Sequence, residues 1–418
     1  MPVNFSDKEA ARLDETDPLG SFRDRFCMPQ AEDGSEMLYL CGHSLGPRPK
    51  STQKYVDDEL EAWKTFGVRG HFRTGEPWVN YPERLAAPMA RIVGAKPSEV
   101  TLMNSLSVNL HVAMASFYRP TTHRYRILIE DHAFPSDRYA IESQMRWHGL
   151  DPADAVLTLK PRSGESALRT DDIEGVIRRE GDSIALILLG AVQYFTGQFF
   201  DIERITAVGH KKGCTVGFDL AHAVGNVPLW LHDHGVDFAV WCTYKYLNSG
   251  PGGVGGLFVH MDRWSSDPPM LAGWWGHNTG TRFNMPDHFE PDAGAAGWQI
   301  SNPPILQMAA LRASLAIFDE AGMEAIRAKS VRLLEYFDLL LRELSPTGYS
   351  VVTPADPASR GAQVSLSLGA SREAMFEMLR DNNVVCDYRG PLIRVSFVPL
   401  YNSFRDVWRF ADILARSM

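Results

Sequence analysis

Short apolar runs alternate with longer amphipathic segments along most of this chain, and this alternation limits the possible folds more than any other feature. We predict strands over Val100–Met103, Arg126–Ile129, Ile184–Leu189, Thr215–Asp219, Phe238–Cys242 and Gly255–Val259. Helices are predicted over Val108–Phe117, Asp137–Trp147 and Asp201–Lys211. Strands that alternate with helices indicate an α/β protein with a mostly parallel sheet, whose strand carboxyl ends meet at one edge.

The C-terminal part of the chain has a different pattern. Two long helices are predicted over Leu306–Phe318 and Met323–Leu344, with Gly322 as the stop between them. Short strands at 349–353, 363–368 and 392–397 follow, around a helix near 373–380. This predicts a compact α+β unit and a domain boundary near residue 310. We therefore expect an N-terminal segment (1–60) that packs on the small domain, a large domain (61–310) and a small C-terminal domain (311–418).

Composition excludes several classes of function. The chain has 418 residues, a length typical of two packed domains, and a net charge of −9, which argues against nucleic-acid or anionic membrane partners. The first twenty residues are charged and have no apolar core, so we expect no signal peptide, and the apolar run Ile184–Val192 is too short to span a membrane. Five scattered cysteines without a C-x-x-C motif suit a reducing cytoplasm.

Two charged residues lie at the carboxyl ends of successive predicted strands. Asp219 ends the strand Thr215–Asp219, and Lys245 follows the strand Phe238–Cys242. A lysine amine forms a Schiff base with the aldehyde of pyridoxal phosphate (PLP), and an acid keeps the ring nitrogen protonated so that the ring accepts electrons. Alone, Asp219 would be read as a buried capping acid and Lys245 as a solvated lysine. The pair on successive strands predicts a PLP site.

Further residues fit the same cofactor, although each also has an ordinary structural explanation. The motif Asn104–Asn109 closes a predicted strand and opens a helix whose free N–H groups suit a phosphate, although simple helix capping explains the motif equally well. Phe134 could stack on the pyridine ring or pack in the core. Asp137 could contact the cofactor or cap a helix, and Tyr244 could donate to the phosphate or be an ordinary strand-end aromatic residue.

Two other motifs do not fit a functional site, and a third motif is missing. The glycine-rich segment 249–256 lacks the residue order of a P-loop, and we predict a turn that allows close backbone approach near the lysine. His232 and His234 lie in a polar turn without a third ligand nearby, so no metal site is predicted. The absence of a G-x-S-x-G motif argues against a serine hydrolase.

Several longer motifs together resemble one enzyme family, the kynureninases. They are Phe218–Asn226, Trp241–Asn248, Ile300–Pro304, Phe134–Asp137, Gln193–Gln198, Gly273–His277, and Arg394 with Pro399–Phe404. The similarity runs from about Leu38 to Phe404 in unchanged order. It implies the PLP-dependent transferase fold type I, with a mostly parallel seven-stranded sheet in a large domain and a smaller C-terminal α+β domain. It also implies a homodimer whose active sites draw residues from both subunits.

The resemblance implies a reaction and a role for each matching residue. The reaction is hydrolytic Cβ–Cγ cleavage of L-kynurenine or 3-hydroxy-L-kynurenine to L-alanine and an anthranilate, in tryptophan catabolism or NAD biosynthesis. Catalytic roles fall to Lys245, Asp219 and Tyr244. The implied cofactor-binding residues are Leu106, Ser107, Phe134, Pro135, Ser136, Asp137, Asp219, His222, Tyr244, Lys245, Trp274 and Asn302. The implied substrate-binding residues are His71, Ser301, Asn302 and Arg394.

Two positions depart from the family pattern. His43 stands where the family usually has asparagine, and Gly190 stands where many members carry a hydroxyl residue. Neither departure affects Lys245 or Asp219, so we expect altered affinity or pocket shape rather than loss of the reaction.

The sequence leaves the substrate and two rival functions open. His71, Ser301 and Asn302 resemble the polar pocket associated with 3-hydroxykynurenine, or are ordinary polar loop residues. A related PLP lyase or desulfurase would act on another amino acid, and a desulfurase needs a catalytic cysteine, for which Cys386 is the only late residue available. A non-enzymatic relative would have no need to retain Lys245, Asp219 and Arg394 together.

Overall fold

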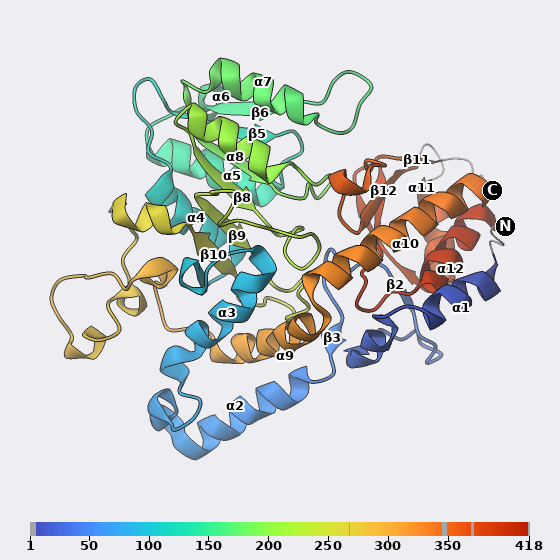
Figure 1. The fold of residues 1–418 in the computed structure, drawn as a ribbon, viewed down its shortest axis with the longest axis horizontal. Helices are drawn as coiled ribbons and strands as arrows, with labels where there is room; N and C mark the ends of the chain where they lie inside the picture. Colours follow the sequence, from blue (N-terminus) through green and yellow to red (C-terminus); the bar gives the residue numbers. More distant parts are fainter. Residues whose placement is uncertain (1–5, 267, 345–348, 369–371, 417–418) are drawn as a thin grey trace.

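The computed structural model describes residues 6–266, 268–344, 349–368 and 372–416, which form a larger and a smaller lobe (Figure 1). A seven-stranded sheet forms the centre of the larger lobe. Its strands lie in the order β4 (Val100–Leu102), β10 (Gly256–Val259), β9 (Phe238–Trp241), β8 (Thr215–Asp219), β7 (Ile184–Gly190), β5 (Arg126–Glu130) and β6 (Val156–Leu159). Only β10 runs antiparallel to its neighbours, so the predicted mostly parallel seven-stranded sheet is confirmed.

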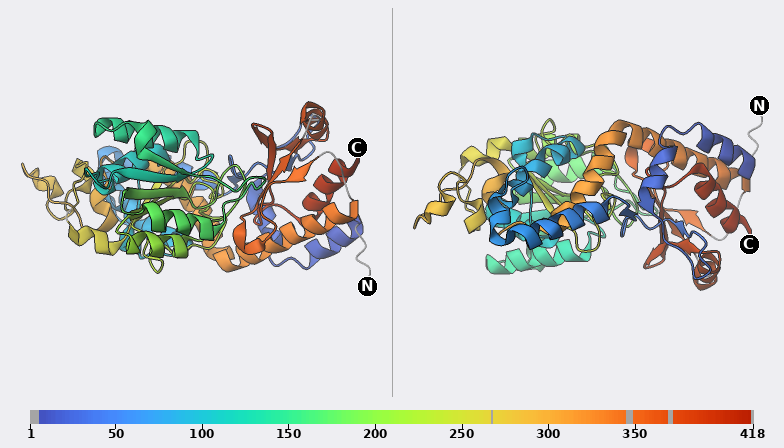
Figure 2. Two further views of the ribbon diagram at one scale, coloured as in Figure 1. Left: turned by 90° about the horizontal axis from the view of Figure 1, so that it is seen from above. Right: turned by 90° about the horizontal axis from the view of Figure 1, so that it is seen from below.

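Both faces of the sheet are buried under helices, which explains why its strands are almost entirely apolar. In β7, Leu186 and Leu188 pack with the core under α4 (Leu106–Phe117) and α5 (Pro135–Trp147). The alternate residues Ile187 and Leu189 pack with the core on the other face. That face is covered by α3 (Tyr81–Val93), α8 (Ile202–Lys211) and α9 (Ile305–Ala321), and Figure 2 shows the sheet between the helix layers.

The strand order creates a crevice at one edge of the sheet. Strands β5 and β7 are neighbours, and the connection after β5 leads to β6 on one side whereas the connection after β7 leads to β8 on the other. Ligands of open α/β sheets bind outside the strand carboxyl ends at such a switch point. Glu130 ends β5, and Gly190 at the end of β7 pairs with Asp219 at the end of β8. The fold therefore brings these three residues to the expected ligand site.

The smaller lobe has its own sheet and core. A four-stranded antiparallel sheet runs in the order β11 (Ser350–Val351), β12 (Gln363–Ser367), β15 (Leu392–Ser396) and β14 (Asp387–Arg389). The lobe also contains α10 (Met323–Leu344), α11 (Arg372–Asp381) and α12 (Phe404–Arg416). A separate cluster of buried side chains fills the space between these elements. The predicted α+β unit is present, with the helices and strands close to their expected positions.

One helix crosses the boundary that we predicted near residue 310. Helix α9 is continuous from Ile305 to Ala321, and its buried residues Met308, Leu311 and Leu315 belong to the core of the larger lobe. It packs against α2 (Thr52–Phe66) and α3. Because Gly322 follows α9 and α10 begins at Met323, we propose that the small domain begins near Gly322 rather than at 311.

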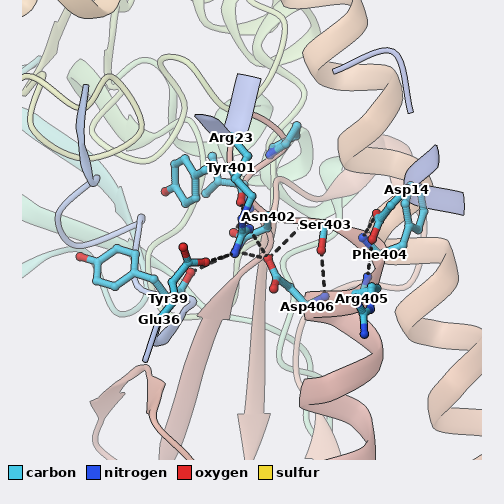
Figure 3. A network of polar contacts seen from close by, with 12 residues as sticks. Asp14, Arg23, Glu36, Tyr39, Tyr401, Asn402, Ser403, Phe404, Arg405 and Asp406 are labelled. Carbon is cyan, nitrogen blue, oxygen red and sulfur yellow. Dashed lines mark hydrogen bonds and ion pairs between the residues drawn. The ribbon is translucent and has the colours of Figure 1, made fainter. Parts of the chain in front are cut away.

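The N-terminal segment contacts both lobes. Helix α1 (Asp7–Glu15) packs on α12, and β2 (Leu38–Tyr39) pairs with β13 (Val384–Val385) of the smaller lobe. Figure 3 shows the polar contacts between them: Arg23 binds Asp406, and Asp14 accepts the N–H groups of Phe404 and Arg405 at the start of α12. Because α2 packs on α9, the proposed association of residues 1–60 with the small domain applies best to the part before α2.

The remaining regular elements are short or lie on the periphery. They are β1 (Phe26–Cys27), β3 (Arg48–Pro49), α6 (Pro152–Ala155) and α7 (Thr170–Glu180). Among the helices in the described part of the chain, none has the length and apolar composition needed to cross a membrane.

Candidate active site

A cavity of about 250 Å³ lies at the carboxyl edge of the large sheet and reaches the smaller lobe. It is lined by His43, Ser44, Leu106, Ser107, Glu130, Phe134, Ser136, Asp137, Gly190, Val192, Tyr194, Asp219, Ala221, His222, Tyr244, Lys245, Arg389 and Arg394. Ten residues that the sequence analysis assigned to the site are therefore brought together, and Pro135, the first residue of α5, lies between two of them.

Four assigned residues are not brought to this cavity within one chain. His71 packs edge-on against Trp78, with the ring centroids 5.4 Å apart. Trp274 is 42% exposed and donates its indole N–H to the carbonyl of Arg282. Ser301 and Asn302 are exposed in the segment before α9. If these residues act in catalysis, they need a second chain to reach a cavity.

The lysine and an aromatic ring lie close together in the cavity. Lys245 follows β9, and its amine nitrogen is 5.7 Å from the centroid of the Phe134 ring. Phe134 is the residue immediately before α5, where its backbone is extended. The Phe134 and Tyr194 rings meet edge to face, with the centroids 5.0 Å apart and the planes at 87°. The face of Phe134 that borders the cavity can stack on a planar ring held by Lys245.

Two carboxyl groups of the cavity lining lie next to each other. Asp219 is buried at the end of β8, accepts the N–H of Ala221 at 2.7 Å, and is hydrogen-bonded to Asp137 in the first turn of α5. Burial and the charge of Asp219 raise the pKa of Asp137. Burial also raises the pKa of Asp219, but the hydrogen bond from Asp137 and the charge of Lys245 oppose that rise. We therefore assign the proton of the pair to Asp137, which donates a hydrogen bond to Asp219, and Asp219 is the carboxylate that can hold a protonated ring nitrogen.

The first turn of α4 provides hydrogen-bond donors in the lining of the same cavity. The side chain of Ser105 makes no capping hydrogen bond, so the N–H groups of Leu106 and Ser107 remain available to an anion. A side chain at Gly255 would lie 3.1 Å from the backbone nitrogen of Leu106. The predicted close approach of the glycine-rich turn is therefore made to the start of α4.

Arg394 is fixed by a network that sequence analysis did not find. Its Nε lies 2.8 Å from Asp387, and its Nη1 donates to the carbonyl of Tyr194 at 2.8 Å. Asp387 also contacts Nε2 of His43 at 3.1 Å. Burial alone would raise the pKa of Asp387, but the hydrogen bonds from His43 and Arg394 outweigh it and lower that pKa. The turn at Gly390 and Pro391 was the sequence signal that could have placed Asp387 opposite Arg394.

The two departures from the family pattern both contact the cavity. His43 is fully buried, and burial lowers its pKa to about 4, so it is neutral near pH 7. At Gly190, an added Cβ atom would lie 3.1 Å from a carboxyl oxygen of Glu130, a cavity residue that the sequence analysis did not assign. Both positions therefore belong to the lining of the cavity that contains Lys245 and Asp219.

The prediction that His232 has no further ligand nearby is wrong, because the fold brings Glu99 and His260 to it. The Nδ1 atom of His232 lies 2.9 Å from Glu99, and the two histidine rings stack with centroids 5.0 Å apart. His260 Nδ1 accepts the N–H of Asp262, and its Nε2 contacts the carbonyl of His232. The parallel rings and these hydrogen bonds explain why Glu99, His232 and His260 lie together, and we infer no metal site from them.

The cysteine required by the desulfurase alternative is poorly suited to that role. Cys386 is partly buried, and burial raises its pKa to about 12. A nucleophilic cysteine reacts as the thiolate, which needs a lowered pKa. This observation argues against desulfurase chemistry at Cys386.

Taken together, the cavity fits pyridoxal phosphate. Free N–H groups at α4 can bind the phosphate, Phe134 offers a ring face, and the Asp137–Asp219 pair can bind the ring nitrogen. The Nδ1 atom of His222 is buried in the cavity wall and has no hydrogen-bond partner among the described residues, so it is available to a bound group.

Comparison with solved structures shows the same fold. The cystine C–S lyase C-DES in complex with cysteine persulfide aligns with a TM-score of 0.77 at 17% identity, covering 91% of this chain and 97% of that chain. Cysteine desulfurase from Thermococcus onnurineus aligns with a TM-score of 0.75 at 17% identity, covering 91% and 94%. At this identity the similarity shows the fold alone, and it confirms the predicted fold type I.

Comparison of the sequence gives much closer relatives. The model of the kynureninase C-terminal domain matches residues 326–414. A kynureninase of Myxococcus xanthus is 52% identical over 417 residues, covering 99% of this chain and 98% of that protein. Kynureninases of Koribacter versatilis (52% identical, 96% of both chains) and Monosiga brevicollis (46% identical, 99% and 96%) are also similar. Identity at this level over almost the full length shows that the chain belongs to the kynureninase family, whose cofactor is pyridoxal phosphate.

Proposed function

We propose that this protein hydrolyses the Cβ–Cγ bond of L-kynurenine or 3-hydroxy-L-kynurenine, giving L-alanine and anthranilate or 3-hydroxyanthranilate. The observation that carries the proposal is the convergence of Lys245, Asp219 and Arg394 on one cavity in a chain of this family. The substrate is a small molecule, and in metabolism the reaction belongs to tryptophan catabolism or NAD biosynthesis, as the family does. We also propose that the enzyme works in the cytoplasm, which suits its five free cysteine thiols.

The residues of the cavity have separate roles in this reaction. When bound, pyridoxal phosphate supplies an aldehyde for the substrate amine and a ring that accepts the electron pair from Cα. Arg394 binds the substrate α-carboxylate, since its guanidinium faces the cavity and is held by Asp387. Lys245, once free, removes the proton from Cα through its amine nitrogen. Asp219 keeps the ring nitrogen protonated, and Asp137 donates a hydrogen bond to Asp219.

The later steps return two protons to the alanine product. Water adds to the ketone carbon, the Cβ–Cγ bond breaks, and the former ketone carbon leaves as the carboxylate of the anthranilate. Cβ and then Cα take up a proton, and Lys245 is the cavity amine that can return the one at Cα. Tyr244 and the first turn of α4 hold the phosphate, which fixes the cofactor while the bonds change.

Purified protein with added pyridoxal phosphate tests this proposal. Wild type is expected to absorb in the visible range and to release an anthranilate from one of the two substrates, whereas Lys245→Ala releases none. Glu142→Gln is the control and is expected to match wild type, because Glu142 is a half-buried residue of α5 that pairs with Arg138 and Arg146 and does not line the cavity. A coloured protein that cleaves neither substrate would favour a related PLP lyase on another amino acid. A protein that never binds the cofactor would overturn the proposal.

We further propose that the enzyme is a homodimer whose active sites draw on both subunits. The four assigned residues outside the cavity support this, because a second copy could deliver them. An exposed apolar group supports it as well: Phe72 and Phe283 contact each other with centroids 5.2 Å apart, Trp274 contacts Phe283, and Met285 is 64% exposed. Exposed apolar groups of this kind mark association surfaces. Light scattering of the eluted protein should give a mass of two chains, and a monomer would contradict the proposal.

The polar residues His71, Ser301 and Asn302 support a proposal about substrate choice. If they line the aryl pocket of the partner subunit, they can hydrogen-bond a 3-hydroxyl group, and 3-hydroxykynurenine is then handled well. The other interpretation is that they are ordinary loop residues. Comparison of kcat/KM for the two substrates decides between them, because a large preference for unsubstituted kynurenine would contradict the pocket.

A further inference from the structure

Glu130 is a buried acid in the cavity that the proposed reaction does not use. It ends β5, is 4% exposed, and contributes to the cavity wall. Its two carboxyl oxygens lie 3.2 and 3.4 Å from the backbone N–H of Gly190, which donates to them. No arginine or lysine side chain forms an ion pair with Glu130 in the part of the chain that the structure describes. A buried carboxylate without a cation is unfavourable, so the side chain is expected to keep its proton.

The charges of the neighbouring elements favour the same protonation state. Asp219 on β8 and Asp137 on α5 are the other two carboxyl groups at this end of the cavity, and Lys245 after β9 is the nearby amine. From β7, Glu130 receives only the backbone N–H of Gly190. Burial, and to a smaller extent the charge of Asp219, raise the pKa of Glu130 to about 8. The two cavity arginines come from the smaller lobe, and both form ion pairs with Asp387.

The contact with Gly190 defines the position of the Glu130 carboxyl group. A side chain at position 190 would put its Cβ atom 3.1 Å from Oε1 of Glu130, which is closer than most contacts that Cβ atoms make in proteins. Glycine at this position therefore leaves room for the carboxyl group between the ends of β5 and β7. The departure at Gly190, for which we expected altered affinity or pocket shape, thus leaves space for an acid.

We propose that Glu130 is a positioning residue of the cofactor site that stays protonated while the enzyme works, so that Asp219 is the single carboxylate facing the ring nitrogen. The inference rests on the cofactor site of the proposed function but not on the identity of the substrate. A protonated Glu130 leaves one negative charge beside the ring nitrogen. An ionised Glu130 adds a second one and changes the electronic state of the bound cofactor.

The first test compares the melting temperature of the holoenzyme with that of Glu130→Gln at about pH 5 and about pH 8.5. An acid whose folded-state pKa is raised loses stability as pH rises from its unfolded value of about 4.5 to about 8. Glutamine has the same shape and cannot ionise. The melting temperature of the variant minus that of wild type should therefore be a few degrees higher at about pH 8.5 than at about pH 5.

Glu99→Gln is the matched control for this test. Glu99 is equally buried but accepts hydrogen bonds from the N–H groups of Lys96 and Met261 and contacts His232, far from the cavity. This substitution should lower the melting temperature at both pH values, because an amide cannot satisfy all of these donors. If Glu130→Gln also lowered the melting temperature at high pH, Glu130 would be an ordinary structural carboxylate and the inference would be wrong.

The second test follows the visible absorption band of the bound cofactor as a function of pH. Wild type should show a step near pH 8 that Glu130→Gln lacks, and superimposable curves would contradict the inference. Gly190→Ala serves as a second variant, because its methyl group must displace the carboxyl of Glu130 and should move the step to another pH. An enzyme that shows the step but cleaves no kynurenine would refute the proposed function alone. An enzyme that cleaves kynurenine without the step would refute only this inference.

Discussion

Asp387 and Arg394 stand directly opposite each other in the antiparallel pair β14–β15, and their side chains form an ion pair beside the cavity. Arg394 is 2% exposed, so its guanidinium has lost most of its water and depends on Asp387 and on the carbonyl of Tyr194 for its orientation. An arginine fixed in this way can bind a substrate carboxylate with little further loss of side-chain entropy, because its side chain is already ordered.

Asp387→Asn is therefore expected to weaken substrate binding more than turnover. The amide removes the negative partner of Arg394, and KM should rise about 10- to 100-fold while kcat changes much less. Steady-state kinetics with kynurenine provide the measurement. Asp338→Asn is the control, because Asp338 pairs with the buried Arg360 away from the cavity. Equal effects of the two substitutions on KM would show that Asp387 has no specific role in binding.

Asp219→Asn and Asp137→Asn should differ, although the two carboxyl groups are hydrogen-bonded to each other. Asparagine at 219 removes the charge that holds a protonated ring nitrogen, and kcat should fall about 100-fold or more. Asparagine at 137 still donates a hydrogen bond to Asp219, because Asp137 is the protonated partner, and activity should stay within about tenfold of wild type. The reverse order of severity in kcat would show that Asp137 is the ionised member.

His43 should make the folded protein sensitive to mild acid. Its folded-state pKa is about 4, against an ordinary value of 6.5, because burial disfavours the charged ring. The unfolded chain therefore binds the proton first, and the stability contributed by neutral His43 is fully present above about pH 6.5. About 3 kcal/mol of it is lost as pH falls toward 4.

Denaturant unfolding of His43→Gln at several pH values tests this expectation. The variant should lose less stability than wild type between about pH 6.5 and 4.5. His123→Gln, at an exposed position, is the control and should follow the wild-type curve. Parallel curves for wild type and His43→Gln would mean that His43 does not titrate in this window.

Subunit mixing tests whether residues outside the cavity act in the partner subunit. Lys245→Ala and Asn302→Ala should each be nearly inactive alone. Equal amounts of the two, exchanged into mixed dimers, should recover roughly a quarter of wild-type activity, because each mixed dimer then contains one intact site. Lys245→Ala mixed with Asp219→Asn is the control, since both residues act in their own subunit and no intact site forms. No recovery in the first mixture would show that Asn302 acts within its own chain or not at all.

The buried pair of Lys329 and Asp17 is expected to anchor the N-terminal segment. The two side chains lie 2.6 Å apart at 4% and 1% exposure, and Lys329 also donates to the carbonyl of Pro399. Lys329→Met leaves Asp17 buried without its cation, which should cost about 3–5 kcal/mol of stability. Addition of Asp17→Asn should restore part of this loss in denaturant unfolding. If the double variant were as unstable as the single one, the unpaired charge would not be the cause.

The sequence by itself determined the local elements and pointed to the residues that we propose to hold the cofactor. The uniformly apolar run at Ile184–Leu189 predicts a strand buried on both faces, and strand β7 confirms it. Asp219 and Lys245 were predictable because each follows a strand whose end lies at the ligand edge of a parallel sheet, and the motifs around them identified the family. These inferences depend on hydrophobic periodicity and on neighbours along the chain.

Only the tertiary structure decided which distant side chains meet. Asp387 beside Arg394, Glu99 beside His232 and Glu130 beside Gly190 are contacts between separate elements, and their geometry depends on strand register and order. The same limit applies to α9, whose amphipathic pattern predicts a helix but not the lobe on which it packs. Periodicity along the chain fixes which face of an element is buried, whereas the choice of partner depends on how all the elements pack together.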